Sequence, residues 1–77
     1  MRQDFKLSSS QLRTFDRALF SFLQGAFERP EARSVFVEAR PEGESTLKTI
    51  DCRCPVMARE LAAEIAEALA RRDAHGF

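Results

Sequence analysis

The apolar residues between positions 12 and 27 predict an amphipathic α-helix with a broad apolar face. They recur at steps of three and four residues, which places them along one side of a helix. The first stripe comprises Leu12, Phe15, Leu19, Phe22 and Ala26, and a second stripe beside it comprises Phe20, Leu23 and Phe27. One small neighbouring element cannot cover both stripes, so we expect part of this face to meet another surface.

Both ends of this helix carry local signals. Ser8 and Gln11 have the spacing of a capping box, in which each side chain bonds the backbone of the other residue. Downstream, Pro30 disfavours helical geometry at Arg29. We therefore expect the helix to begin after Ser8 and to end near Glu28.

The middle of the chain has the pattern of a β-hairpin. Residues 35–40 alternate in the manner of a strand, and in the turn that follows Gly43 can adopt a positive φ. Residues 45–52 are rich in β-branched side chains and form the return strand. On a regular strand Leu47 and Ile50 fall on opposite faces. Either a β-bulge restores the alternation, or the sheet has a second apolar surface that holds Phe36 and Leu47.

A second helix is predicted to begin at Pro55, because the N–H that proline lacks has no partner in the first helical turn. Its apolar face comprises Met57, Leu61, Ile65, Ala68 and Leu69. Gly76 can end this helix. A polar loop over residues 29–34 joins the first helix to the hairpin.

The predicted order is helix, strand, strand, helix. This is an α+β fold in which two helices pack on an antiparallel hairpin. We expect a single αββα domain over residues 8–74, an N-terminal extension over residues 1–7 and a C-terminal tail over residues 75–77. A chain of 77 residues buries only about 60% of the surface that it exposes when unfolded, so its core alone provides little stability.

This order also predicts a homodimer. A two-stranded hairpin is marginal in water, and both of its edges stay open to pairing. Two copies that pair hairpin to hairpin across a two-fold axis form a four-stranded antiparallel sheet with helices packed against it. The expected contact residues are Phe20, Leu23, Phe27, Phe36 and Leu47.

Charge and hydropathy narrow the range of partners. Twelve basic and twelve acidic residues cancel, whereas nucleic-acid binders usually have a basic excess, so weak nucleic-acid binding is only an alternative function. The basic residues available for it are Arg13, Arg17, Arg33, Arg40, Arg71 and Arg72. No stretch approaches the roughly 20 apolar residues of a membrane span. The charged start of the chain is unlike a signal peptide, so the expected location is the cytoplasm.

Cys52 and Cys54, the only cysteines, are candidates for a thiol or metal site. Zinc ligands usually have about two to four residues between them, and here there is one. Alternate Cα atoms on a strand lie about 6.6 Å apart, further than the spacing that most disulfides adopt. The only histidine, His75, is close to the end of the chain. We therefore favour two small buried side chains at a strand-to-helix junction, with a thiol or metal site at Cys52 and Cys54 as the alternative.

No other group of residues resembles a catalytic site. The three glycines are too far apart for a phosphate-binding loop, and a serine nucleophile has no histidine base nearby in the sequence. We expect no enzymatic activity and no cofactor. The expected function is protein–protein interaction by a regulatory, adaptor or inhibitor-like homodimer, with a further protein as partner.

Overall fold

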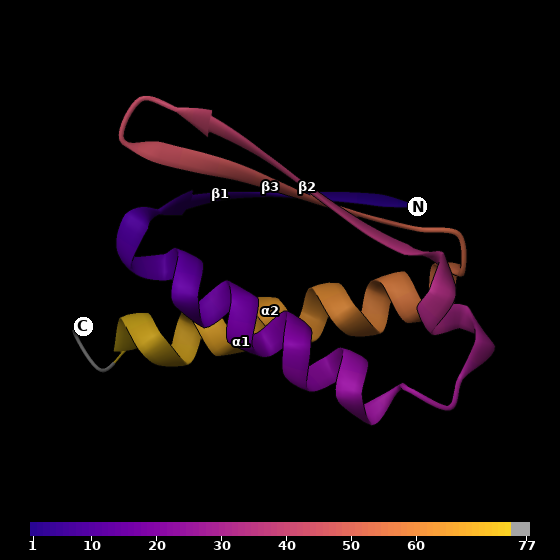
Figure 1. Cartoon of the computed structure of the whole chain (residues 1–77). Helices are drawn as coiled ribbons and strands as arrows, with labels where there is room; N and C mark the ends of the chain where they lie inside the picture. The colour runs from indigo at the N-terminus through magenta and orange to yellow at the C-terminus, as the bar shows by residue number, and fades with distance from the viewer. Residues whose placement is uncertain (75–77) are drawn as a thin grey trace.

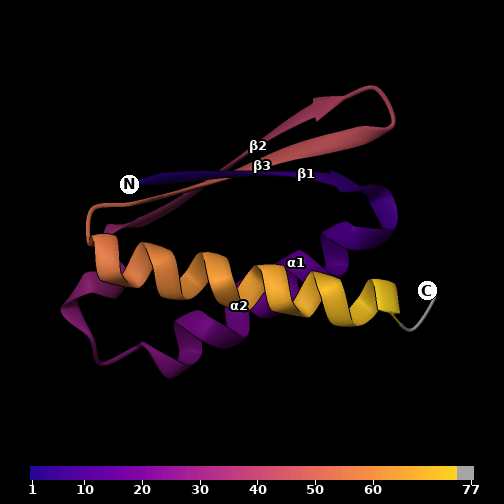
Figure 2. The same cartoon turned by 180° about the vertical axis from the view of Figure 1, so that it is seen from behind.

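The computed structural model describes residues 1–74 and shows a three-stranded sheet with two helices against one of its faces (Figures 1 and 2). The elements are β1 (Arg2–Ser8), α1 (Ser9–Gly25), the 3-10 helix η1 (Pro30–Ser34), β2 (Val35–Glu42), β3 (Ser45–Cys52) and α2 (Pro55–Ala74). The α+β class and the two predicted helices are confirmed. Gly76, the predicted end of the last helix, lies outside the described residues.

Strand β3 is the centre of the sheet, whose order is β1-β3-β2 with antiparallel pairing throughout. The register runs without interruption from Val35 opposite Cys52 to Glu42 opposite Ser45, so the return strand has no bulge. The hairpin turns at Gly43, whose φ of 62° confirms the predicted positive φ. Because each chain has three strands, pairing two copies edge to edge would give six strands instead of the predicted four.

The strand β1 is absent from the sequence-based prediction, which places residues 1–7 outside the folded unit. In the structure these residues pair with β3 along their whole length, from Arg2 opposite Asp51 to Ser8 opposite Ser45. Alternation along β1 sends Phe5 and Leu7 toward the helices, and Leu7 is buried. The element order is therefore β-α-β-β-α.

The core fills the single layer between sheet and helices. Its main cluster joins one residue from β1, one from α1, one from β3 and two from α2: Leu7, Phe15, Ile50, Leu61 and Ile65. The ring of Phe15 meets that of Phe5 edge to face, with centroids 5.5 Å apart. Next to it a second cluster of Ala26, Cys52, Met57 and Ala58 closes the end of the molecule where α2 begins.

Helix α1 begins as predicted and ends earlier than predicted. The capping box is present, and the N–H of Ser8 donates to Oε1 of Gln11 at 3.0 Å. The helix ends at Gly25, not near Glu28, and the backbone turns at Ala26. Glycine at the last helical position weakens helix propagation, and the N–H of Arg29 donates to the oxygen of Ala26 at 2.8 Å to close the turn.

Candidate functional site

The outer face of the sheet, which points away from the helices, carries alternating charges. Since Ile50 packs into the core, its neighbours Thr49 and Asp51 and the residues opposite them face outward. The charged side chains on this face are Arg2, Asp4, Lys6, Glu38, Arg40, Glu42 and Asp51. Phe36 and Leu47 also face outward, as a regular strand without a bulge requires. Thr49 and the charged residues beside it separate them, so they form no continuous apolar surface.

A larger apolar surface lies on one flank of α1 and continues to η1. We call it the α1–η1 patch and define it by Phe20, Leu23, Phe27 and Ala32. Phe20 is 64% exposed and Phe27 is 83% exposed, whereas Leu23 and Ala32 are half-buried. Leu23, Phe27 and Ala32 line an open cavity of about 550 Å³ together with the side chains of Glu28 and Arg33. The first stripe of α1 is thus turned toward the core and the second toward solvent.

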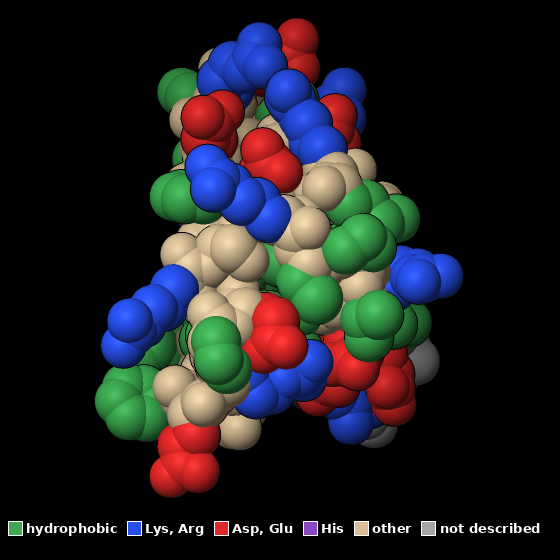
Figure 3. Space-filling view, turned by 90° about the vertical axis from the view of Figure 1, so that its right-hand side faces the viewer, with side chains coloured by type: hydrophobic (Ala, Val, Ile, Leu, Met, Phe, Trp, Pro, Cys, Tyr) green, Lys and Arg blue, Asp and Glu red, His purple; other side chains and the backbone are tan. Residues whose placement is uncertain are grey.

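The five predicted contact residues therefore fall into two groups on different layers of the molecule. Phe20, Leu23 and Phe27 belong to the helix layer, and Phe36 and Leu47 belong to the outer face of the sheet. Figure 3 shows hydrophobic side chains emerging in separate groups between basic and acidic ones on one end of the molecule. A single flat interface cannot use both groups of the same copy.

The junction between β3 and α2 places the two cysteines in different surroundings. Cys52 is fully buried, and its Sγ donates to the backbone oxygen of Cys54 at 3.4 Å and lies 3.8 Å from Oγ of Ser34. Cys54 is half-buried, and its oxygen accepts from the N–H of Ala58 at 2.9 Å, a bond that starts α2. Both are free thiols. This arrangement is that of a packed strand-to-helix junction.

The described part of the chain, residues 1–74, contains no group of three or more His, Cys, Asp or Glu side chains that could hold a metal ion. His75 lies outside the described residues. Nothing in the geometry of Cys52 and Cys54 therefore adds a ligand to the pair, and a metal site there has no structural support.

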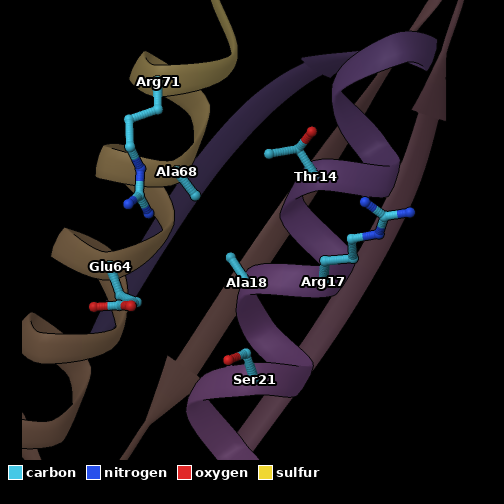
Figure 4. Close-up of a pocket in the computed structure, with 7 residues that line it drawn as sticks. All are labelled: Thr14, Arg17, Ala18, Ser21, Glu64, Ala68 and Arg71. Carbon is cyan, nitrogen blue, oxygen red and sulfur yellow. The ribbon is translucent and has the colours of Figure 1, made fainter.

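A shallow groove between the two helices, on the side away from the sheet, has two of the candidate basic residues, Arg17 and Arg71, in its lining, but the Arg17 side chain points away from α2 (Figure 4). Figure 4 shows its lining side chains, which are Thr14, Arg17, Ala18, Ser21, Glu64, Ala68 and Arg71. The groove has a volume of about 280 Å³. Glu64, on α2 with Arg71, also lines the groove (Figure 4), so the local charge is mixed. Arg33 and Arg40 lie on η1 and β2, away from this groove, and Arg72 is paired with Asp73 at 3.3 Å.

One ion pair fastens the loop after α1 to the second helix. Nη1 of Arg29 donates to Oε2 of Glu60 at 2.9 Å, and Glu31 lies 3.7 Å from the same guanidinium. The hydrogen bond to Glu60 raises the pKa of Arg29 above its usual value. The ion pair thereby holds Arg29 beside the start of η1, next to the α1–η1 patch.

Comparisons of the chain with protein-family models, with curated proteins and with solved structures find no match. Within residues 1–74, neither helix is long and apolar enough to cross a membrane. The functional interpretation consequently depends on the surfaces described above.

The open edges of the sheet differ from those of the predicted hairpin, in which both strands lie at an edge. Strand β2 lies at one edge, and every residue of it after Val35 is exposed. The strand order shows that only β2 of the hairpin stays at an edge, because β1 pairs with the other side of β3. The sequence signal that could have indicated β1 is the alternation of Phe5 and Leu7 with charged neighbours.

Proposed function

We propose that this protein acts by binding other protein chains, and that its first partner is a second copy of itself. The observation that carries self-association is the open sheet edge at β2, which can accept a strand of another chain. Binding of a further protein is supported by the exposure of Phe20, on α1, and of Phe27, two residues after that helix ends. Exposed apolar patches are typical of contact surfaces in soluble proteins.

The proposed role is that of a regulatory, adaptor or inhibitor-like homodimer without catalysis, located in the cytoplasm. The cavity beside Leu23 and Phe27 is large enough to accept an apolar side chain from a further protein. Glu28 and Arg33 at its rim provide one negative and one positive group that can orient the incoming segment. Aromatic residues in a pocket with a polar rim are the arrangement found at many binding hot spots.

Light scattering after size-exclusion chromatography tests the proposal. We expect the mass of a dimer at about 10 μM, a concentration at which a stable specific interface is occupied. The variant Phe27→Ser is expected to keep the dimer mass in the same experiment, because the patch is the proposed contact for a further protein and an exposed side chain can be replaced with little effect on the fold. A wild-type protein that stays monomeric up to about 100 μM would contradict self-association as the primary function.

A further inference from the structure

The open edge of the sheet at β2 is regular and long enough to accept another strand. Strand β2 has eight residues, and the two helices pack on β1 and β3 in preference to it. Figures 1 and 4 agree that β2 lies on the side of α1 that faces away from α2. An edge of this kind presents backbone N–H and C=O groups that have no partner within the sheet.

The hydrogen-bonding pattern shows which backbone groups point to the open edge. The N–H of Arg53 donates to the oxygen of Ser34 at 3.4 Å, so Ser34 and alternate residues after it bond to β3. Pro41 has no N–H and belongs to the other set, which agrees with this assignment. The groups at Val35, Val37 and Ala39 therefore face outward, and Pro41 offers only its oxygen.

Side-chain charges distinguish this edge from the edge at β1. On β1, Nε of Arg2 lies 3.4 Å from Oδ1 of Asp4, so these neighbouring charges are already paired. Glu38 and Arg40 on β2 have no ion-pair partner within 4.0 Å among residues 1–74. They lie on the same face of the strand, two residues apart, with Ala39 between them.

We propose that two copies of this chain pair β2 with β2 in antiparallel orientation about a two-fold axis at Ala39. This inference rests on the self-association proposed above and identifies its surface. In this register Ala39 lies opposite Ala39 of the second copy, and Glu38 lies opposite its Arg40, twice per dimer by symmetry. On the helix side of the sheet, Val37 lies opposite Pro41 of the second copy. Opposite charges thus meet on one face and apolar side chains meet on the other.

Other two-fold registers of this edge are less favourable. An axis at Glu38 places that carboxylate opposite itself, and an axis at Arg40 does the same for the guanidinium. At Pro41 both opposing residues lack the N–H that the pair needs. An axis at Val37 leaves Arg40 opposite Ser34, with no acidic partner. Of these registers, only the one at Ala39 satisfies the charges and keeps its central hydrogen bonds.

The resulting assembly has a continuous six-stranded sheet with both pairs of helices on one face, because the two-fold axis runs perpendicular to the sheet. The four residue-to-residue steps from Val35 to Ala39 span about 13 Å. The cavity of the α1–η1 patch, lined by Leu23, Phe27 and Ala32, adjoins η1, which directly precedes Val35. It therefore lies toward the Val35 end of β2, away from the axis at Ala39, and stays open for a different protein. The homodimer contact and this cavity are separate surfaces.

A charge exchange tests the register. Glu38→Arg and Arg40→Glu each convert two attractive pairs of the dimer into two repulsive ones. We expect either change to weaken dimerisation at least about tenfold by sedimentation equilibrium at low salt, where exposed charges are screened least. The double variant restores both pairs and is expected to return to within about threefold of the wild-type dissociation constant. Glu67→Arg on α2 is the control for a change of net charge.

Removal of the central hydrogen bonds is a second test. Ala39→Pro deletes an outward N–H, as Pro41 already does two residues later, and leaves the bonds between β2 and β3 intact. We expect a folded monomer by circular dichroism and light scattering. Glu38→Pro is the matched variant, since it deletes an N–H that bonds to β3 and should unfold the hairpin.

The outcomes separate this inference from the proposed function. A wild-type dimer that resists both single charge changes, or that the double variant fails to restore, overturns the β2 register and leaves self-association intact. Dimerisation that persists in Ala39→Pro overturns it as well. A wild-type monomer overturns both proposals together. If Ala39→Pro does not fold, the charge variants still decide, because Glu38 and Arg40 are exposed and their replacement does not threaten the fold.

Discussion

Cys52 and Cys54 are two residues apart and differ in what surrounds them, which determines what each thiol can do. Cys52 fills a space among Ala26, Met57 and Ala58, where its sulfur has no access to solvent. Cys54 is half-buried at the start of α2. Reactivity of a thiol requires access for the reagent, so the two side chains should behave differently in the folded protein.

We expect a thiol reagent to modify Cys54 in the native protein and to modify Cys52 only when the chain opens. In the variant Cys54→Ser, labelling of Cys52 by an aromatic disulfide reagent should be slower than labelling of Cys54 in Cys52→Ala by at least about a hundredfold, because access requires local unfolding. The measurement is the rate of absorbance change at neutral pH. Equal rates in the two variants would show that the junction is open and would revive the thiol-site alternative.

Phe15 and Phe20 are the same residue type on the same helix, yet one is buried and the other is exposed. Phe15 is buried against Phe5, with Nζ of Lys48 5.7 Å from the centre of its ring, whereas Phe20 is 64% exposed. We expect Phe15→Ala to lower the free energy of unfolding by about 3–5 kcal/mol and Phe20→Ala by less than about 0.5 kcal/mol. Urea unfolding at a single protein concentration measures both. Similar losses in the two variants would mean that Phe20 is buried in solution, which in turn would extend the dimer contact to α1.

At the scale of elements, the strand β1 changes what stabilises the fold. It converts a two-stranded hairpin into a three-stranded sheet and places β3 at the centre with both of its edges paired. Leu7 from β1 is in the main core cluster, and Phe5 packs beside it. Strand β1 therefore provides, within one chain, much of the stabilisation that the sequence-based prediction assigns to a second copy.

Substitution of Leu7 tests the contribution of β1. Leu7→Ala should lower the free energy of unfolding by about 2–5 kcal/mol, the usual cost of truncating a buried leucine. Lys6→Ala, on the exposed face of the same strand, should change it by less than about 0.5 kcal/mol. Thermal and urea unfolding followed by circular dichroism provide the values. A Leu7→Ala variant as stable as the wild type would indicate that residues 1–7 are an extension after all.

The elements that the sequence predicts are those with local signals. The stripes of α1, the proline at the start of α2 and the Gly43 turn each involve residues close together in the chain. β1 has only Phe5 and Leu7 as apolar positions, and it is a strand because it pairs with β3, which lies beyond α1 and β2 in the chain. The sequence likewise indicates which apolar residues are exposed, but not on which layer of the fold each of them lies, because that depends on tertiary contacts. Phe20 and Phe36 are both exposed as the dimer hypothesis requires, yet they lie on different layers, and only the tertiary fold separates them.

The whole molecule is a thin slab, with Cα extents of 35 × 25 × 16 Å. The short dimension holds one sheet layer and one helix layer, so there is a single plane of core and a large perimeter. A two-layer molecule of this kind can extend its core by adding strands at an edge of the sheet. Strand β2 is the edge that the helices do not cover. Growth at this edge joins two slabs in one plane and leaves the charged outer face of the sheet in solvent.

This mode of assembly predicts that thermal stability depends on protein concentration. When folding and dimerisation are coupled, each tenfold rise in concentration adds about 1.4 kcal/mol per dimer, and for a dimer of this size the melting temperature should rise by about 3–6 °C. Scanning calorimetry or circular dichroism over about two decades of concentration above the dissociation constant measures this slope. Glu38→Arg should flatten the slope in the lower decade of this range, where a dissociation constant raised about tenfold leaves most of the folded protein monomeric, whereas Phe20→Ala should keep the slope throughout. A melting temperature that does not change with concentration in the wild type would mean that the single slab is stable alone and that the open edge of β2 has another use.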